Sequence, residues 1–493
     1  MEHALACPLK SGFLAIAVFA TLGQAPSPET ETLTIDAISA TKPFPHVWEQ
    51  MFGSGRAILS LRESYRRDLR LTKAITGIQY VRFHGILDDQ VGIYRNGSYN
   101  FSYLDEIYDG LLANGVRPFV ELSFMPRDLS ASDKLHAFWY KPYPNPPKDY
   151  SRWEDLIYNF TRHCLDRYGE DEVARWYFEV WNEPNIDFWT GEPKQASYFQ
   201  LYDHAARAVK RASARLRVGG PATAQAAWVD AMIRHCTEAK IPLDFVSTHV
   251  YGNDRAQDVF GTDEDIPRSS MVARSVRKVF DQVKASTRPG IPIIWSEYNA
   301  SYMNEVDVTD SPFMGPWLAN NIRQCDGMTT LMSYWTFSDV FEEQGVVPKP
   351  FYGGYGLIAA GGIPKAAFNA FSMLHRLGTE RIPVASTNAL ATRKPDGGVA
   401  VAIWNYAPPG EAGLPRRFQI STAGLGPSAH YRVTILDRDH GSALTAWQAM
   451  GSPAFPARAQ QEQLRSAATA LGHSNSSTVV LAAHGLALVE VDK

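Results

Sequence analysis

Short apolar runs alternate with longer amphipathic stretches from about residue 42 to about residue 378. The apolar runs are rich in aromatic and β-branched residues, which favour strands. They predict eight strands, at 51–53, 80–83, 117–124, 176–181, 216–219, 245–249, 293–296 and 329–335. Between them, apolar residues at helical spacing predict helices that include 61–76, 152–168, 196–215 and 270–286.

Eight strands alternating with helices favour an α/β fold, a (β/α)8 TIM barrel over residues 42–378. A doubly wound open sheet is the alternative. No early strand is followed by the glycine pattern or phosphate-binding loop that such sheets often carry, so the barrel is the better interpretation.

The pattern changes at about residue 379. Short runs of alternating polarity, separated by Pro, Gly and Ser, lie at 399–406, 416–420, 430–436 and 478–491, and they predict an accessory C-terminal β-sandwich domain over 379–493. Residues 30–41 resemble a lone strand, which we expect to join that sandwich. The stretch 466–471 fits either a brief helix or a loop.

Composition excludes several classes of partner. The chain has 493 residues, of which 45% are apolar, so it can bury a large core. Its net charge of −4 gives no electrostatic reason to expect binding to nucleic acid or to an anionic membrane. Four cysteines at scattered positions, with no clustered His, predict neither a zinc site nor a disulfide framework. The scattered His and Asp residues lack metal-ligand spacing, so no metal is expected. The oligomeric state cannot be deduced from the sequence.

The N-terminus resembles an export signal. An apolar stretch at 13–22 follows Lys10 and precedes the small-residue pattern Gly23-Gln24-Ala25. This predicts a signal peptide over residues 1–25 and a periplasmic or secreted protein. Glu2 and Pro26 are unusual for such a signal, so a cytoplasmic location is the alternative.

Two glutamates occupy equivalent positions at the ends of predicted strands. Glu183 lies in WNEPN after the fourth strand, and Glu297 lies in SEYNAS at the end of the seventh. The C-terminal ends of the strands in a parallel barrel form one rim, so the two carboxyl groups are expected to face each other there. Glu183 before Pro184 could instead begin the next helix, but a facing pair is what hydrolysis of a sugar linkage requires.

Further polar and aromatic side chains are predicted on the same rim. Each has a structural alternative, because a lone His, Phe or Trp is often a core residue. Glu179 lies within a strand and is expected to pair with Arg82 inside the barrel. We interpret the remaining rim residues as candidates for binding the substrate: His84, Phe124, Asn182, His249, Tyr251, Trp335 and Glu343.

Several strings together resemble glycoside hydrolase family 39, the β-xylosidase and α-L-iduronidase family, over about residues 46–378. They are RFHG, ELSFMP, WNEPN, SEYNAS, FEE, FYGGYGLI and GIPKAAF. The resemblance implies a cofactor-free hydrolase that retains anomeric configuration, with Glu183 as acid/base and Glu297 as nucleophile. It also implies that Asn182 holds the 2-hydroxyl of the sugar. Retention requires carboxyl groups roughly 5 to 5.5 Å apart, and inversion about 6.5 to 9.5 Å.

Within that family, the string SEYNASY is closer to the xylosidase form than to the iduronidase form. The loop VYGNDRAQ lacks the basic string that would bind a uronate carboxylate, and Arg255 is its one candidate cation. We therefore expect removal of xylose from the non-reducing end of β-xylosides or xylo-oligosaccharides. The alternatives are an α-L-iduronidase, β-glucosidase, β-galactosidase, α-L-arabinosidase or exopolysaccharide hydrolase, exo- or endo-acting, or a carbohydrate-binding protein without catalysis.

Overall fold

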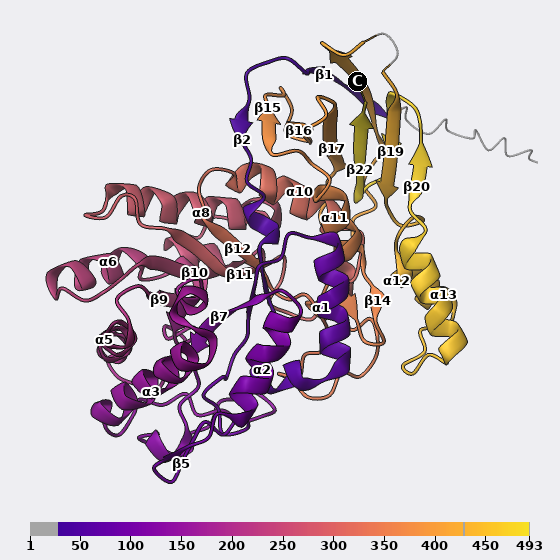
Figure 1. Cartoon of the computed structure of the whole chain (residues 1–493). Coiled ribbons are helices and arrows are strands. Elements are labelled where there is room, and N and C mark those ends of the chain that lie inside the picture. The colour runs from indigo at the N-terminus through magenta and orange to yellow at the C-terminus, as the bar shows by residue number, and fades with distance from the viewer. Residues whose placement is uncertain (1–27, 427–428, 493) are drawn as a thin grey trace, which may run out of the picture.

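A computed structural model describes residues 28–426 and 429–492 (Figure 1). The predicted signal peptide at 1–25 lies outside the described residues. Within the described ranges, no helix combines the length and the apolar character that crossing a bilayer requires. The barrel occupies the larger, lower part of the view in Figure 1, and the C-terminal sheets stand above it.

The predicted barrel is confirmed. Eight parallel strands close into a ring in which spatial order follows chain order, as expected when each strand is followed by a crossover helix. All eight coincide with a predicted apolar run. They are β3 (Met51–Gly53), β4 (Tyr80–Arg82), β7 (Arg117–Leu122), β8 (Tyr177–Val180), β9 (Arg217–Thr223), β10 (Phe245–Tyr251), β11 (Ile293–Asn299) and β12 (Leu331–Tyr334).

Amphipathic helices cover the outside of the barrel and bury one face each. The four helices whose ranges the sequence predicted are present, and their ends differ from the predicted ends by at most three residues. The main helices are α1 (Glu63–Ile75), α2 (Ser102–Ala113), α3 (Tyr150–Tyr168), α5 (Lys194–Ala212), α6 (Val229–Glu238), α8 (Arg268–Ala285), α10 (Met314–Cys325) and α11 (Ala366–Leu374). Short helices lie between them: α4 (Glu170–Val173), α7 (Ala256–Phe260) and α9 (Val306–Thr309).

The interior of the barrel is layered because alternate residues of a strand point inward. An apolar layer closes the N-terminal end, and it consists of Met51, Tyr80, Phe119, Tyr177, Phe245, Ile294 and Leu331. Two residues further along six of these strands lies a buried polar layer of Arg82, Glu121, Glu179, Ser247, Ser296 and Ser333. The functional rim therefore rests on a polar layer, which rests on an apolar floor.

The C-terminal region forms two sheets that share one hydrophobic cluster. The larger contains β2 (Lys42–Pro43), β15 (Glu380–Ile382), β16 (Ala389–Arg393), β17 (Val399–Asn405), β22 (Gly485–Val491), β19 (Tyr431–Leu436) and β20 (Gly472–Ser474). The smaller contains β1 (Glu29–Asp36), β18 (Arg416–Ala423) and β21 (Thr478–Leu481). The N-terminal strand β1 pairs in parallel with β18.

The sequence pattern did not predict α12 (Ala443–Ala449) in this region, and it indicated only the end of α13 (Arg458–Thr469). The uncertain stretch 466–471 is mostly helical and ends the longer helix α13, which lies beside α12. Only Leu464 and Ala468 of α13 are buried, so its apolar periodicity is weak. Two small hairpins complete the described part of the chain, β5 (Tyr94–Arg95) with β6 (Ser98–Tyr99), and β13 (Ile358–Ala359) with β14 (Ile363–Pro364).

Candidate active site

A pocket of about 380 Å³ opens at the C-terminal ends of the barrel strands. Seven of the nine residues predicted for the site line it, namely His84, Asn182, Glu183, Tyr251, Glu297, Trp335 and Glu343. The other two, Phe124 and His249, are fully buried behind the wall. Phe124 packs against Trp181 and Phe188 rather than facing the cavity.

Loops supply the rest of the wall, and sequence reasoning did not assign these residues to the site: Phe138, Ile186, Phe188, Ala224, Gln225, Asp254, Tyr302, Gln344 and Tyr355. Some carried a usable signal, because Ile186 and Phe188 closely follow WNEPN and Tyr355 lies in FYGGYGLI. Phe138 carried none, since it belongs to a long segment without helical or strand periodicity.

Glu183 is positioned by unusual backbone just beyond β8. Trp181 and Glu183 have φ angles of 72° and 44°, in the left-handed region that costs most residues about 1–3 kcal/mol. The Glu183 side chain is about nine-tenths buried and lies 3.0 Å from Nδ1 of His249. Burial raises the pKa of its carboxyl well above the ordinary range, and the carboxylates of Glu297 and Asp254 raise it further.

The hydrogen bonds of His249 show that Glu183 carries the proton in the bond between them. Ser296 Oγ donates to Glu179 Oε1 at 2.6 Å, so it accepts from Nε2 of His249 at 3.1 Å. Burial holds the pKa of His249 well below its usual value, so the ring is neutral and its single proton is on Nε2. Nδ1 is then an acceptor, and Glu183 must be the protonated donor to it.

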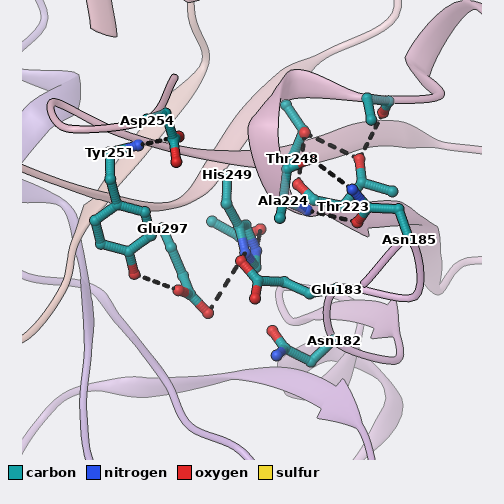
Figure 2. A network of polar contacts seen from close by, with 12 residues as sticks. Asn182, Glu183, Asn185, Thr223, Ala224, Thr248, His249, Tyr251, Asp254 and Glu297 are labelled. Atoms are coloured by element: carbon teal, nitrogen blue, oxygen red, sulfur yellow. Dashed lines mark hydrogen bonds and ion pairs between the residues drawn. The ribbon is translucent and has the colours of Figure 1, made fainter. Parts of the chain in front are cut away.

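Glu297 accepts hydrogen bonds from two side chains, of which Figure 2 shows Tyr251. Arg82 Nη1 donates to Oε1 and the Tyr251 hydroxyl donates to Oε2, both at 2.6 Å. Burial and the charge of Glu297 raise the pKa of Tyr251 well above its usual value, so the phenol keeps its proton. Oxygens of Glu183 and Glu297 lie within 4.8 Å of each other.

Arg82 organises the layer beneath the pocket. The predicted pair with Glu179 is present, at 2.6 Å from Nε, and a second carboxylate, Glu121, lies 2.8 Å from Nη2. Nη2 also donates to Oδ1 of Asn182 at 2.9 Å. Since the amide oxygen of Asn182 is engaged in this way, its NH₂ group is the part available to the pocket.

His84, Trp335 and Glu343 form the wall opposite Glu183. His84 Nδ1 bonds to Glu121 at 2.8 Å, its Nε2 lies 3.5 Å from Glu343 Oε1, and its ring lies 4.8 Å from the Trp335 ring. Burial raises the pKa of Glu343 to about 8, against the opposing effect of His84. This wall offers polar groups beside an indole face, which suits a sugar ring.

A buried ion group fixes the loop that carries Glu343 and Tyr355. Lys365 Nζ lies 2.6 Å from both Asp310 and Asp339 and donates to the carbonyl of Gly354 at 2.9 Å. The two carboxylates accept from the backbone N–H groups of Gly353 and Gly356. A Cβ at Gly354 would lie 2.5 Å from Asp339, so this close approach requires glycine.

A closed parallel barrel with a protonated and an ionised glutamate facing each other across its rim defines a glycoside hydrolase of the two-carboxylate kind. Comparison with known proteins gives the family. The model of Glycosyl hydrolases family 39 matches residues 31–480, and the chain belongs to this family.

Its relatives include both branches of the family. A β-xylosidase from Geobacillus stearothermophilus is 36% identical over 439 residues, 86% of each chain. The crystal structure of a monomeric β-xylosidase from Caulobacter crescentus has a TM-score of 0.84 and 32% identity, covering 94% of this chain and 99% of that one. An α-L-iduronidase from Homo sapiens is 28% identical over 225 residues, 41% of this chain and 31% of that protein.

Proposed function

We propose that the protein is a retaining β-xylosidase that removes xylose from the non-reducing end of β-xylosides or xylo-oligosaccharides. The observation that carries the proposal is the pair of unlike carboxyl groups, one protonated against His249 and one ionised between Arg82 and Tyr251. Their oxygens, within 4.8 Å, favour the short separation of retaining enzymes. The xylosidase relatives that cover most of the chain support the sugar.

In the first step Glu297 attacks the anomeric carbon while Glu183 gives its proton to the glycosidic oxygen. The bond between the anomeric carbon and that oxygen breaks, the leaving group departs as an alcohol, and an ester joins the sugar to Glu297. The NH₂ group of Asn182 is free to donate to the 2-hydroxyl, since its oxygen already accepts from Arg82.

In the second step water attacks the anomeric carbon and releases Glu297 as a carboxylate. Glu183, now ionised, takes a proton from that water and returns to its acid form. His249 favours this return, because an ionised Glu183 would place a carboxylate oxygen against the lone pair of Nδ1. Two inversions at the anomeric carbon give retention.

The charges around the pocket favour a neutral sugar over a uronate. Among the described residues, no lysine or arginine lines the cavity, while Asp254, Glu183, Glu297 and Glu343 do. The sequence left Arg255 as a candidate for binding a uronate carboxylate. Its side chain is 73% exposed and pairs with Asp258, outside the lining residues. A uronate would therefore meet carboxyl groups without a cation.

Pocket size supports action at a chain end. A cavity of about 380 Å³ lies near the lower end of the range for ligand sites, roughly 300–1,000 Å³. It suits a sugar unit and part of its leaving group better than a long polysaccharide. Release of single xylose units from xylotriose would agree with this, and release of internal fragments from xylan would contradict it.

The test compares β-xyloside, β-glucoside, β-galactoside, α-L-arabinoside and α-L-iduronide chromogenic substrates, using wild type, Glu183→Ala and Glu297→Ala. We expect preferred turnover of the xyloside and its collapse in both variants. Proton NMR of the first-formed sugar should show β-xylose, and α-xylose would exclude retention. Binding of xylosides by the folded protein without turnover would favour a carbohydrate-binding protein instead.

A further inference from the structure

The pocket has one side that faces the leaving group. Glu183 must lie beside the glycosidic oxygen in order to protonate it, so the wall around Glu183 surrounds the departing half of the substrate. Three neighbouring strands, β8, β9 and β10, supply this wall through the loops at their C-terminal ends. Ile186 comes from the first loop, Gln225 from the second and Asp254 from the third.

Asp254 has one engaged and one unengaged oxygen. Its side chain is about nine-tenths buried, and Oδ2 accepts from the backbone N–H of Tyr251 at 2.8 Å (Figure 2). Among the described residues, Oδ1 has no hydrogen-bond partner, and Asp254 lines the cavity. An acceptor oxygen that faces the cavity without a partner is a group that a donor on a ligand would complete.

Gln225 offers a second group on the same side. Its backbone is left-handed, with φ 63° and ψ 31°. The next residue, Ala226, and Ala222 three residues earlier also have positive φ. This strained turn holds Gln225 at the pocket wall, and no described side chain or backbone group bonds to its amide. An amide can both donate to and accept from a hydroxyl.

The wall of the same pocket also contains a flat apolar surface. Phe138 and Phe188 line the cavity with ring centroids 5.1 Å apart in an edge-to-face arrangement. Aromatic rings can pack on the C–H face of a sugar while carboxyl and amide groups bind its hydroxyls. An alkyl or aryl leaving group could use the rings but not the polar groups.

We propose that Asp254 and Gln225 form a leaving-group subsite that binds the hydroxyls of a second sugar, so that the preferred substrates are xylo-oligosaccharides rather than alkyl or aryl xylosides. The inference rests on the proposed β-xylosidase function. A leaving group without hydroxyls covers Asp254 and leaves its oxygen unpaired, whereas a sugar hydroxyl donates to it. A site built in this way discriminates against the analogue that lacks the hydroxyl.

The test uses two substrates with alcohol leaving groups, xylobiose and cyclohexyl β-xyloside. Both leaving groups need protonation by Glu183, but only xylobiose brings hydroxyls to Asp254. Asp254→Asn keeps the size of the side chain and an oxygen for the Tyr251 N–H, while it removes the charge. Gln225→Ala removes the amide, and Asp263→Asn, an exposed position outside the pocket wall, is the matched control.

We expect the ratio of kcat/KM for xylobiose to that for cyclohexyl β-xyloside to fall about 10-fold in Asp254→Asn and to fall also in Gln225→Ala, with no change in Asp263→Asn. An unchanged ratio in Asp254→Asn, including an equal loss on both substrates, would overturn the subsite, since Asp254 would then act only through Glu183. Wild-type turnover of 4-nitrophenyl β-xyloside checks the proposed function separately. Silence of the wild type on all three xylosides would reject that function and the subsite with it.

Discussion

The Tyr251 hydroxyl donates to Oε2 of Glu297 across two adjacent barrel strands, at 2.6 Å. In the register of these strands His249 stands opposite Glu297, so the strand that bonds to the nucleophile candidate also carries the acceptor for Glu183. One strand, β10, therefore sets the state of both carboxyl groups. Small changes in its side chains should alter the two groups in different, measurable ways.

Tyr251→Phe should lower kcat/KM for aryl β-xylosides about 10-fold to 100-fold, because the carboxylate of Glu297 loses a buried donor. The ring stays, so its contacts across the pocket with Tyr302 are kept. Steady-state kinetics measure the effect. Tyr103→Phe, at an exposed position of α2, is the control. Equal kinetics in the two variants would show that the Tyr251 hydroxyl has no role.

Ser296→Ala should shift the alkaline limb of the pH–kcat/KM profile to lower pH. Without Ser296, Nε2 of His249 loses its acceptor and the proton can move to Nδ1, where it donates to Glu183 and favours its ionised form. Glu183 must be protonated to act as an acid, so a lower pKa means loss of activity at lower pH. Ser333→Ala, another buried barrel serine, should leave the limb in place.

Glu183→Gln should stabilise the protein at neutral pH by about 0.5–2 kcal/mol. The pKa of Glu183 is raised in the folded state, so its stabilising protonated form is complete below the unfolded-state pKa and is lost as pH rises through the folded-state pKa. Glutamine stays neutral and can still donate to His249. Denaturant unfolding at pH 7 and at acid pH, with Glu462→Gln as an exposed control, should show a gain only at pH 7.

Lys365→Met should destabilise the protein by about 3–5 kcal/mol, because Asp310 and Asp339 would share a buried site without a cation. The triple variant with Asp310→Asn and Asp339→Asn as well should recover part of this loss. Chemical denaturation measures both, and exposed Lys284→Met is the control. No recovery in the triple variant would mean that packing rather than charge accounts for the effect.

The sequence predicted the barrel because continuous apolar runs mark fully buried parallel strands, and their ends mark the rim. That is why Glu183 and Glu297 could be placed opposite each other before any coordinates. The position of Glu179 within a strand also predicted its pair with Arg82 inside the barrel. The sequence pattern could not show that Phe124, just past a strand end, turns behind the pocket wall, because the chain has left the strand geometry there.

Loop residues of the pocket wall were harder to predict. Gln225 reaches the wall through left-handed backbone at residues other than glycine, for which the local sequence gives no signal. Asp254 lies in the loop VYGNDRAQ, which drew attention only because it lacks a basic string for a uronate carboxylate. Its place in the pocket depends on tertiary structure, namely on its burial and on its bond to the Tyr251 N–H. Neither leaves a pattern along the chain.

The pairing of β1 with β18 has a consequence for synthesis on the ribosome. Ser421 and Leu33 are hydrogen bonded although 388 residues separate them. At 5–20 residues per second, the first strand waits roughly 20 to 80 s for its partner to be made. The barrel has its last strand well before that time, so assembly can proceed from the middle outward, with the two ends of the chain joined last. A nascent chain stalled shortly after residue 378 should therefore contain a folded barrel, while β1 has no partner strand and is still open to protease.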